Sequence, residues 1–207
     1  MADIRKVTEE SIRYASEIIR RGGLVVYPTD TVYGLGCDPF DEESVKRIFT
    51  VKEREKNPLP VLSSSIADAN RIALFTNTEN KMARLFWPGA LTIVLRKRET
   101  LPSIVTLGQN KVGVRVPNLQ VTRKLIRLCG GLLIGTSANI SGKPSSRTAV
   151  EAAEQLGDKV DLILDFGSRN MTESSTVVEI VDSNLRILRE GPITLKEITG
   201  KLCDGEA

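Results

Sequence analysis

Two short apolar runs constrain the fold of this chain more than any other feature of its sequence. One is Leu24–Tyr27, which follows Gly22-Gly23, and the other is Leu132–Ile134, which follows Gly130-Gly131. Runs of this length without polar alternation are typical of strands that lie in the core. Each glycine pair also ends a stretch with helical periodicity, since glycine favours the end of a helix. The order of helix, turn and buried strand therefore predicts an α/β fold.

Helices and strands alternate along the rest of the chain. Periodicity and capping residues predict helices at 8–21, from 41 into the Lys52–Lys56 segment, from 65, and at 78–86, 118–128, 149–156 and 194–202. Further strands are predicted at 61–62, 91–95, 111–116, 162–164, 176–180 and 186–188. Some strands follow one another directly and others are separated by helices, which indicates a mixed parallel and antiparallel sheet. No repeat or linker-like change in composition interrupts residues 1–207, so one domain is expected.

The absence of histidine from the 207 residues excludes several kinds of active site. Ser-His-Asp and Cys-His nucleophile systems need an imidazole, and so does any zinc site with a histidine ligand. The three cysteines, Cys37, Cys129 and Cys203, lie too far apart for a metal-binding spacing. No protein-bound zinc is therefore expected, and the chemistry must use lysine, arginine, carboxylates, hydroxyls or backbone amides.

Composition also bears on location and partners. The N-terminal sequence MADIRKVTEE has no apolar region of a secretory signal, and no apolar run approaches the roughly 18 residues of a membrane span. With three separated cysteines, this indicates a cytoplasmic protein that does not enter a membrane. A net charge of +3 permits an anionic partner, whereas 4% aromatic residues argue against a base-stacking platform.

A polar loop follows each of the two apolar runs. Pro28–Gly36 and Gly135–Gly142 are rich in hydroxyl side chains and are punctuated by glycine. In open α/β sheets, ligands bind in loops beyond the carboxyl ends of strands. The two loops could thus form two walls of one cleft, although the same residue types also serve turns and helix caps.

Basic residues provide a second indication of ligand binding. Lys52, Arg54 and Lys56 alternate with glutamates near the end of a predicted helix, where they form either a solvated charged face or an anion clamp. Arg115 lies within a predicted strand and Arg189 closes a later one. A strand arginine among apolar residues needs an anionic partner, which is either a protein carboxylate or a ligand.

Six motifs occur in one order along the chain. They are PTDTVYGLG at 28–36, Lys52-x-Arg54 with Pro58-Leu59, VRVP at 114–117, TSANISG at 136–142, STVVEI at 175–180 and ILREG at 187–191. This set resembles the YrdC/Sua5 family of L-threonylcarbamoyladenylate synthases, over about residues 8–200. The resemblance implies a single YrdC-like domain with a twisted sheet and a concave basic groove. It also implies that the C-terminal extension domain of longer Sua5 proteins is missing.

The resemblance implies a nucleotidyltransferase that makes threonylcarbamoyl-AMP and diphosphate from L-threonine, bicarbonate and ATP, with Mg²⁺ accompanying the ATP. The product would serve formation of N6-threonylcarbamoyladenosine in tRNA by a downstream threonylcarbamoyl transferase complex. Family members are also described as binding double-stranded RNA, so tRNA or double-stranded RNA is a further expected partner. Such a reaction depends on positioning and charge neutralisation, which a site without histidine can supply.

Site residues follow from the resemblance at the matching positions. L-Threonine would be bound by Thr31, Arg115, Thr136 and Ser175. ATP would be bound by Lys52, Arg54, Asn57, Ser137, Asn139, Ser145 and Arg189, and Lys52 and Arg54 would be catalytic.

The sequence departs from the family pattern in three places. Glu55 replaces a proline of the Lys-x-Arg-Pro motif, and the segment before Pro58 is one residue short, which affects the assignment of Asn57. Leu62 or Ser63 stands where many members have a histidine, and Lys111 stands where a threonine is common. The corresponding ligand contacts must be made by other groups or not at all.

Two alternative functions fit parts of the pattern. A non-catalytic protein that binds double-stranded RNA or tRNA, for instance in ribosome assembly, would show steeply salt-dependent RNA binding without ATP turnover. A carbamoyl-adenylate enzyme with another substrate would use carbamoyl phosphate in place of threonine and bicarbonate.

Overall fold

The first apolar run forms a central strand of a five-stranded sheet in the computed structural model, which describes residues 3–53, 57–168, 173–182 and 184–204. Within these residues the strand order of this first sheet is β1-β10-β2-β3-β9. The strands are β1 Asp3–Lys6, β2 Val25–Tyr27, β3 Gly34–Gly36, β9 Thr136–Ser137 and β10 Leu162–Asp165. Strands β1, β10 and β2 are parallel, whereas β3 is antiparallel to both β2 and β9.

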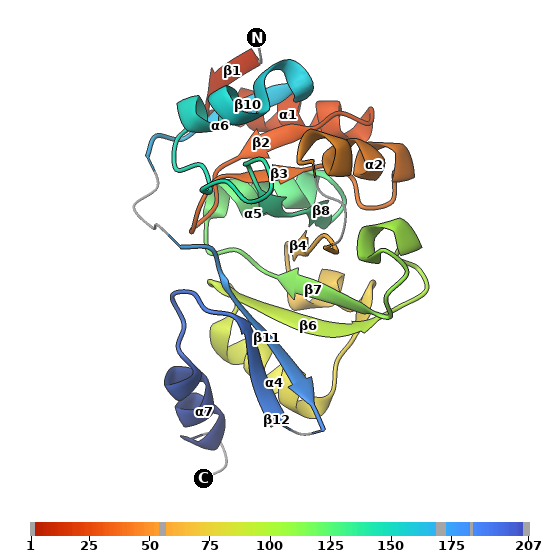
Figure 1. The fold of residues 1–207 in the computed structure, drawn as a ribbon, viewed down its shortest axis with the longest axis vertical. Coiled ribbons are helices and arrows are strands. Elements are labelled where there is room, and N and C mark those ends of the chain that lie inside the picture. The colour runs from red at the N-terminus through yellow and green to blue at the C-terminus, as the bar shows by residue number, and fades with distance from the viewer. Residues whose placement is uncertain (1–2, 54–56, 169–172, 183, 205–207) are drawn as a thin grey trace.

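The second apolar run forms the edge strand β8 of a second sheet. In the described part of the chain this sheet has the order β12-β11-β6-β7-β4-β8, with β5 paired to β6. Its strands are β4 Val61–Ser63, β5 Ala73–Leu74, β6 Leu91–Lys97, β7 Lys111–Arg115, β8 Leu132–Ile134, β11 Thr176–Val181 and β12 Asn184–Arg189. Figure 1 shows β6, β7, β11 and β12 below the first sheet, with β4 and β8 between.

Both apolar runs are covered on their two faces. Leu24 and Val26 belong to the larger hydrophobic cluster, whereas Val25 and Tyr27 belong to the smaller one. Successive side chains of a strand point to opposite faces, so β2 contributes to a core on each side. Strand β8 divides its residues between the same two clusters. This two-sided burial explains why neither run contains polar residues.

Seven α-helices surround the sheets in the described residues. They are α1 Glu9–Arg20, α2 Glu42–Val51, α3 Ile66–Ala69, α4 Asn77–Phe86, α5 Gln120–Leu128, α6 Ala149–Leu156 and α7 Leu195–Asp204, with 3-10 turns at Ser103–Thr106 and Gly157–Lys159. Helices α1 and α5 pack together over the smaller cluster, and α4 packs against α7. Thr8, Asp41 and Ser65 cap α1, α2 and α3 with side-chain oxygens, and the predicted starts of these helices lie at the same residues. None of the helices in the described residues is long and apolar enough to cross a membrane.

The prediction of an α/β fold with parallel and antiparallel strands is confirmed, and three details differ from it. The strands form two sheets instead of one. Strands β3 and β9 lie inside the two segments that were predicted to be loops, because pairing between them creates strands that neither segment shows locally. Helix α2 ends at Val51 instead of continuing into Lys52–Lys56, and Glu53 has a positive φ of 52°. A left-handed residue cannot continue a right-handed helix.

Candidate functional site

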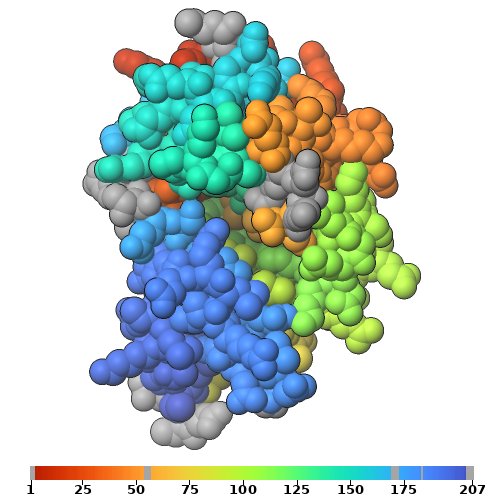
Figure 2. Space-filling model, in the orientation of Figure 1, coloured from red at the N-terminus to blue at the C-terminus, as the bar shows by residue number. Residues whose placement is uncertain are grey.

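A cavity of about 440 Å³ lies between the two sheets. One wall is the first polar loop with β3 and β9, and the other is the face of the second sheet that β6, β7, β11 and β12 present. The segment from Asn57 to Pro60 closes one side. Figure 2 shows the surface hollowed between α2 and α6 above and the C-terminal strands below. The cavity therefore collects side chains from segments that are distant in sequence.

Backbone pairing brings the two polar loops together. Gly34 of β3 is the register partner of Ser137 of β9, and the amide of Ala138 donates to the carbonyl of Tyr33 at 2.8 Å. Both loops thus line one cleft, as predicted, but they pair side by side and form the same wall of it, so the prediction of two separate walls is wrong. This arrangement arises because both loops follow strands that end near the same place, at the junction of the two sheets.

Tyr27 explains why glycine is needed at two positions of the first loop. A Cβ atom at Gly36 would lie 2.2 Å from the carbonyl oxygen of Ile134 and 2.9 Å from the Tyr27 ring. A Cβ atom at Gly34 would also lie 2.9 Å from this ring. Burial raises the pKa of Tyr27, so its hydroxyl stays protonated and donates to the Ile134 carbonyl at 2.7 Å. The phenol thus supports the cavity wall from within.

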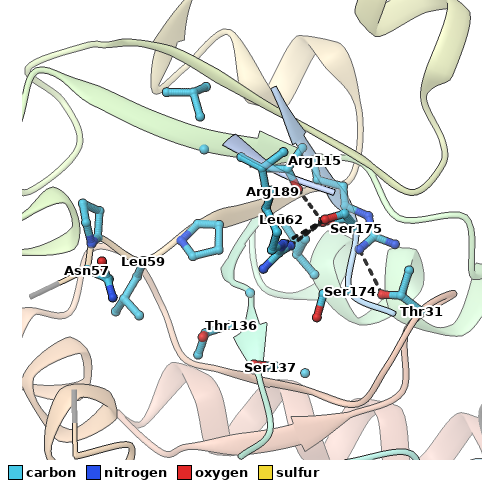
Figure 3. Close-up of a pocket in the computed structure, with 18 of the residues that line it drawn as sticks. Thr31, Asn57, Leu59, Leu62, Arg115, Thr136, Ser137, Ser174, Ser175 and Arg189 are labelled. Atoms are coloured by element: carbon cyan, nitrogen blue, oxygen red, sulfur yellow. Dashed lines mark hydrogen bonds between the residues drawn. The ribbon is translucent and has the colours of Figure 1, made fainter. Parts of the chain in front are cut away.

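Arg115 is the central cation of one end of the cavity. Its side chain is 6% exposed, and its Nη2 atom forms an ion pair with Asp30. Its Nη1 atom donates to Thr31 Oγ1 at 3.2 Å, and its Nε atom donates to the Gly89 carbonyl at 2.8 Å. The sequence left the anionic partner of this strand arginine open, and the structure identifies a protein carboxylate. Arg115 still lines the cavity, as Figure 3 shows together with its contact to Thr31.

The first polar loop is organised by its own hydroxyl groups. Thr29 Oγ1 donates to the Val32 carbonyl at 2.6 Å and accepts from the Thr31 amide at 3.1 Å. The hydroxyls of Thr29 and Thr31 lie 3.0 Å apart. These bonds fix the turn, and Thr29 and Thr31 also line the cavity. The two threonines therefore serve both as turn residues and as part of the cavity wall, the two roles that the sequence left open.

Arg189 and Ser175 form a second polar group beside Arg115. Arg189 donates to the Ser175 carbonyl from Nε at 3.1 Å and from Nη2 at 2.7 Å, and Nη2 also lies 3.1 Å from Ser175 Oγ. Ser175 Oγ lies 2.8 Å from the hydroxyl of Thr92 on β6. In Figure 3 Arg115, Ser175 and Arg189 point toward the same part of the cavity. This end of the cavity is dense in hydrogen-bond donors.

The opposite end of the same sheet face carries a pair that the sequence reasoning missed. Lys111 on β7 forms an ion pair with Glu179 on β11, and both residues line the cavity. Lys111 lies four residues from Arg115, which is roughly 13 Å along an extended strand. Gly113 and Val94 form the floor between the two ends. The sequence could have indicated this pair, because the alternation of side chains along β7 and β11 places Lys111 and Glu179 on the face that carries Arg115.

Seven of the eleven predicted site residues line this cavity. They are Thr31, Asn57, Arg115, Thr136, Ser137, Ser175 and Arg189. Asp30, Thr92 and Glu179 take part in the same arrangement and were not among the predicted site residues. Arg54 lies outside the described residues.

Lys52, Asn139 and Ser145 do not line the cavity, although all three were predicted to contact ATP. Lys52 is 1% exposed, and its Nζ donates to the carbonyls of Ser137 at 2.5 Å and Asn139 at 2.7 Å. The side-chain amide of Asn139 donates from Nδ2 to the carbonyls of Ile140 and Lys143 at 3.0 and 2.6 Å. Lys52 and Asn139 are thus engaged in holding the second polar loop.

The charge of the cavity is more balanced than that of a uniformly basic groove. Lys111, Arg115 and Arg189 line it together with Glu179, and Asp30 neutralises Arg115 from behind. In the described ranges no group of three or more His, Cys, Asp or Glu could hold a metal ion. The arrangement suits a ligand that has an anionic group at the Arg115 end and further polar groups along the floor.

Comparisons with known proteins show which family this chain resembles. A family model described as "Telomere recombination" and labelled Sua5_yciO_yrdC matches residues 17–191. A Pyrococcus abyssi relative named threonylcarbamoyl-AMP synthase is 41% identical over 195 residues, which cover 93% of this chain and 57% of the relative. A Methanocaldococcus jannaschii relative named putative threonylcarbamoyl-AMP synthase is 31% identical over 200 residues, which cover 94% of this chain and 94% of the relative.

A solved structure gives a similar result. The crystal structure of P. abyssi Sua5 complexed with L-threonine superposes with a TM-score of 0.90 and 39% identity, covering 97% of this chain and 60% of that one. This chain therefore spans somewhat more than half of the Pyrococcus protein and nearly all of the Methanocaldococcus relative.

Proposed function

This chain belongs to the Sua5/YrdC family, and from that premise we propose that it is an L-threonylcarbamoyladenylate synthase. It would convert L-threonine, bicarbonate and ATP into threonylcarbamoyl-AMP and diphosphate. The observation that carries the proposal is the single cavity in which Thr31, Arg115 and Arg189 meet residues of both polar loops. A cavity of about 440 Å³ is in the size range of small-molecule and cofactor sites.

The residues would divide between the two substrates as the family resemblance implies. Arg115 would pair with the carboxylate of threonine, and Thr31, Thr136 and Ser175 would complete that subsite. Asn57, Ser137 and Arg189 would contact ATP, with Arg54 as a further phosphate contact. Lys52 would act on this nucleotide site through the loop that it holds, since its ammonium bonds to the carbonyls of that loop.

The proposed reaction has two steps. The amine of threonine combines with bicarbonate to give a carbamate and water, and a carbamate oxygen then attacks the α-phosphorus of ATP as diphosphate leaves. Holding the anionic nucleophile in line with the phosphorus supplies most of the advantage, because proximity replaces an encounter in solution. Fixed donors such as Arg189 would stabilise the charge that develops on the phosphate oxygens.

Mg²⁺ would arrive with ATP and would neutralise the diphosphate leaving group. The cavity lining supports this division, because Glu179 is its one carboxylate among the described residues and is already paired with Lys111. The described residues that line the cavity therefore do not form a site in which several carboxylates would bind Mg²⁺.

The product would be passed to a threonylcarbamoyl transferase that modifies adenosine in tRNA. Binding of tRNA or double-stranded RNA by this chain belongs to the same proposal. The relatives' names favour the synthase over a purely RNA-binding role.

Diphosphate release from ATP tests the proposal directly. We expect release that requires both L-threonine and bicarbonate, and that falls to background when either is left out. Arg115→Ala should raise the KM for threonine, whereas Arg96→Ala, which removes an exposed arginine from the neighbouring strand β6, should leave it unchanged. Diphosphate release that continues at the same rate without threonine would refute the synthase assignment.

A further inference from the structure

The ion pair between Asp30 and Arg115 raises a question about the amino-acid subsite. Under the proposed function, Arg115 receives the carboxylate of the substrate. Yet its guanidinium already has a carboxylate partner within the protein, and the two side chains are only 14% and 6% exposed. A ligand carboxylate must therefore share the guanidinium with Asp30.

Asp30 lies outside the cavity, so it would be next to a ligand at Arg115 and would not occupy the ligand's position. Arg115 lines the cavity together with Thr29 and Thr31, whereas Asp30 itself does not line it. The bonds from Arg115 to Thr31 and to the Gly89 carbonyl hold the guanidinium between the two sheets. Asp30 thus approaches Arg115 from the side of the loop, and a ligand approaches from the cavity.

Two carboxylates that share one guanidinium are close enough for their like charges to repel each other. In a site that is largely withdrawn from water, such like charges repel by an amount that strongly reduces affinity. The pair Asp30–Arg115 has no net charge. For a purely anionic ligand, the attraction to Arg115 is therefore largely cancelled by the repulsion from Asp30. A ligand that carries its own positive charge next to its carboxylate avoids this loss.

We propose that Asp30 is a specificity-determining residue that restricts this subsite to zwitterionic α-amino acids and rejects monoanionic carboxylates of the same shape. It would act through charge alone, by balancing Arg115 before the ligand arrives. This is selection by an unfavourable interaction with the wrong ligand, in addition to attraction for the right one. The inference rests on the proposed function, since it assumes that an amino acid binds at Arg115.

The other charged groups of the cavity are consistent with this role. Arg189 donates three hydrogen bonds to Ser175 and belongs to the proposed nucleotide contacts. Lys111 lies roughly 13 Å farther along β7 and is balanced by Glu179. In the proposed reaction the phosphates of ATP also bring negative charge close to the amino acid. A neutral zwitterion is therefore the form of the amino acid that this arrangement binds with the least repulsion before the carbamate is made.

Binding of two ligands of one shape and different charge tests the inference. The probes are L-threonine and the matching 2,3-dihydroxybutanoate, in which a hydroxyl replaces the ammonium, and their Kd values are measured by calorimetry. For the wild-type protein we expect threonine to bind clearly more tightly. In Asp30→Asn, which keeps the shape of the side chain and removes its charge, we expect the ratio of the two Kd values to fall at least tenfold.

Two further variants separate charge selection from damage to the loop. Asp30→Glu keeps the charge and should retain most of the wild-type preference. Glu43→Gln removes an equal charge from an exposed pair with Lys46 and should leave the ratio unchanged, because surface charges are screened. Circular dichroism and thermal unfolding establish that each variant is folded.

Three outcomes would count against the inference, and they can be told apart. If Asp30→Asn keeps both affinities near wild type and leaves the ratio within twofold, Asp30 does not select by charge. If the folded variant loses both ligands in equal proportion, or fails to fold while Asp30→Glu also loses the preference, Asp30 only supports the loop. If the wild-type protein binds no threonine at all, the proposed function fails, and the inference that depends on it fails as well.

Discussion

Replacing Lys52 by methionine tests whether this lysine holds the second polar loop or acts on phosphates directly. Methionine has nearly the same length and removes only the ammonium group. In the wild-type structure that group donates to the carbonyls of Ser137 and Asn139 at 2.5 and 2.7 Å, and a weaker contact of 3.4 Å reaches Asn139 Oδ1. The substitution therefore leaves two nearly buried carbonyl oxygens without this donor.

The magnitude follows from those two carbonyls. A buried acceptor that loses its partner costs roughly 1–3 kcal/mol, and hydrogen bonds from charged donors lie toward the upper end. The gain from no longer burying a charge offsets part of this cost. We therefore expect a loss of about 3 kcal/mol in the free energy of unfolding. For a chain of this size that corresponds to a decrease in Tm of roughly 6–12 °C.

Denaturant unfolding followed by tryptophan fluorescence measures this loss. Trp87 is the one tryptophan of the sequence, and it is buried in the larger cluster, so its emission reports on the folded core. Lys46→Met is the matched control in the helix that precedes Lys52, because Lys46 is exposed and its ion pair with Glu43 lies at the surface. The control should change stability by less than about 0.5 kcal/mol.

Activity of the same variant completes the test. The KM for ATP should rise, because Ser137 belongs to the loop that Lys52 holds and lines the cavity. If Lys52→Met keeps wild-type stability and yet loses turnover, the ammonium acts directly on the nucleotide and our reading of its contacts is wrong.

Two further predictions concern glycine and pH. Gly36→Ala should destabilise the protein by about 3 kcal/mol in denaturant unfolding, because its Cβ would lie 2.2 Å from the Ile134 carbonyl. By contrast, Gly200→Ala in α7, where a Cβ meets nothing within 4 Å, should stabilise it by up to about 1 kcal/mol, and equal effects of the two would contradict the packing argument. The pKa of Asp41 is lowered by the hydroxyl of Ser44, by the amides of Ser44 and Glu43 and by the charge of Arg47. The stability that Asp41 contributes as cap of α2 is therefore present above roughly pH 4 and is lost as the pH falls through the lowered pKa. Asp41→Asn should therefore reduce the loss of thermal stability between pH 5 and pH 2, as measured by circular dichroism, and an unchanged acid profile would show that this carboxyl does not contribute.

The sequence predicted the elements whose signals are local. The helix caps Thr8 and Asp41 are recognised by the residue itself, because a short polar side chain satisfies the first free amides of a helix. The strand of residues 132–134 was predicted with its observed bounds, since it is apolar on both faces. Thr31, Arg54, Arg115, Ser137 and Arg189 were expected to share one hollow; four of them line the cavity, and Arg54 lies outside the described residues.

Other features depend on contacts between distant segments. Nothing near Arg115 in sequence indicates that Asp30 neutralises it, because the two residues are 85 positions apart and meet only where the two sheets join. Lys52 looks like a surface cation at the end of a helix, yet tertiary packing buries it under the second polar loop. The pairing of β3 with β9 likewise creates strands in segments that are locally turn-like.

The sequence alone thus determined the class of fold, the order of its elements and the set of polar side chains available for chemistry, because helix periodicity, capping and strand burial are properties of neighbouring residues. Only the tertiary structure decided which cations face the cavity and which carboxylates balance them. Hydrogen bonds and ion pairs act over a few ångströms in space, and the spacing of residues along the chain does not report those distances.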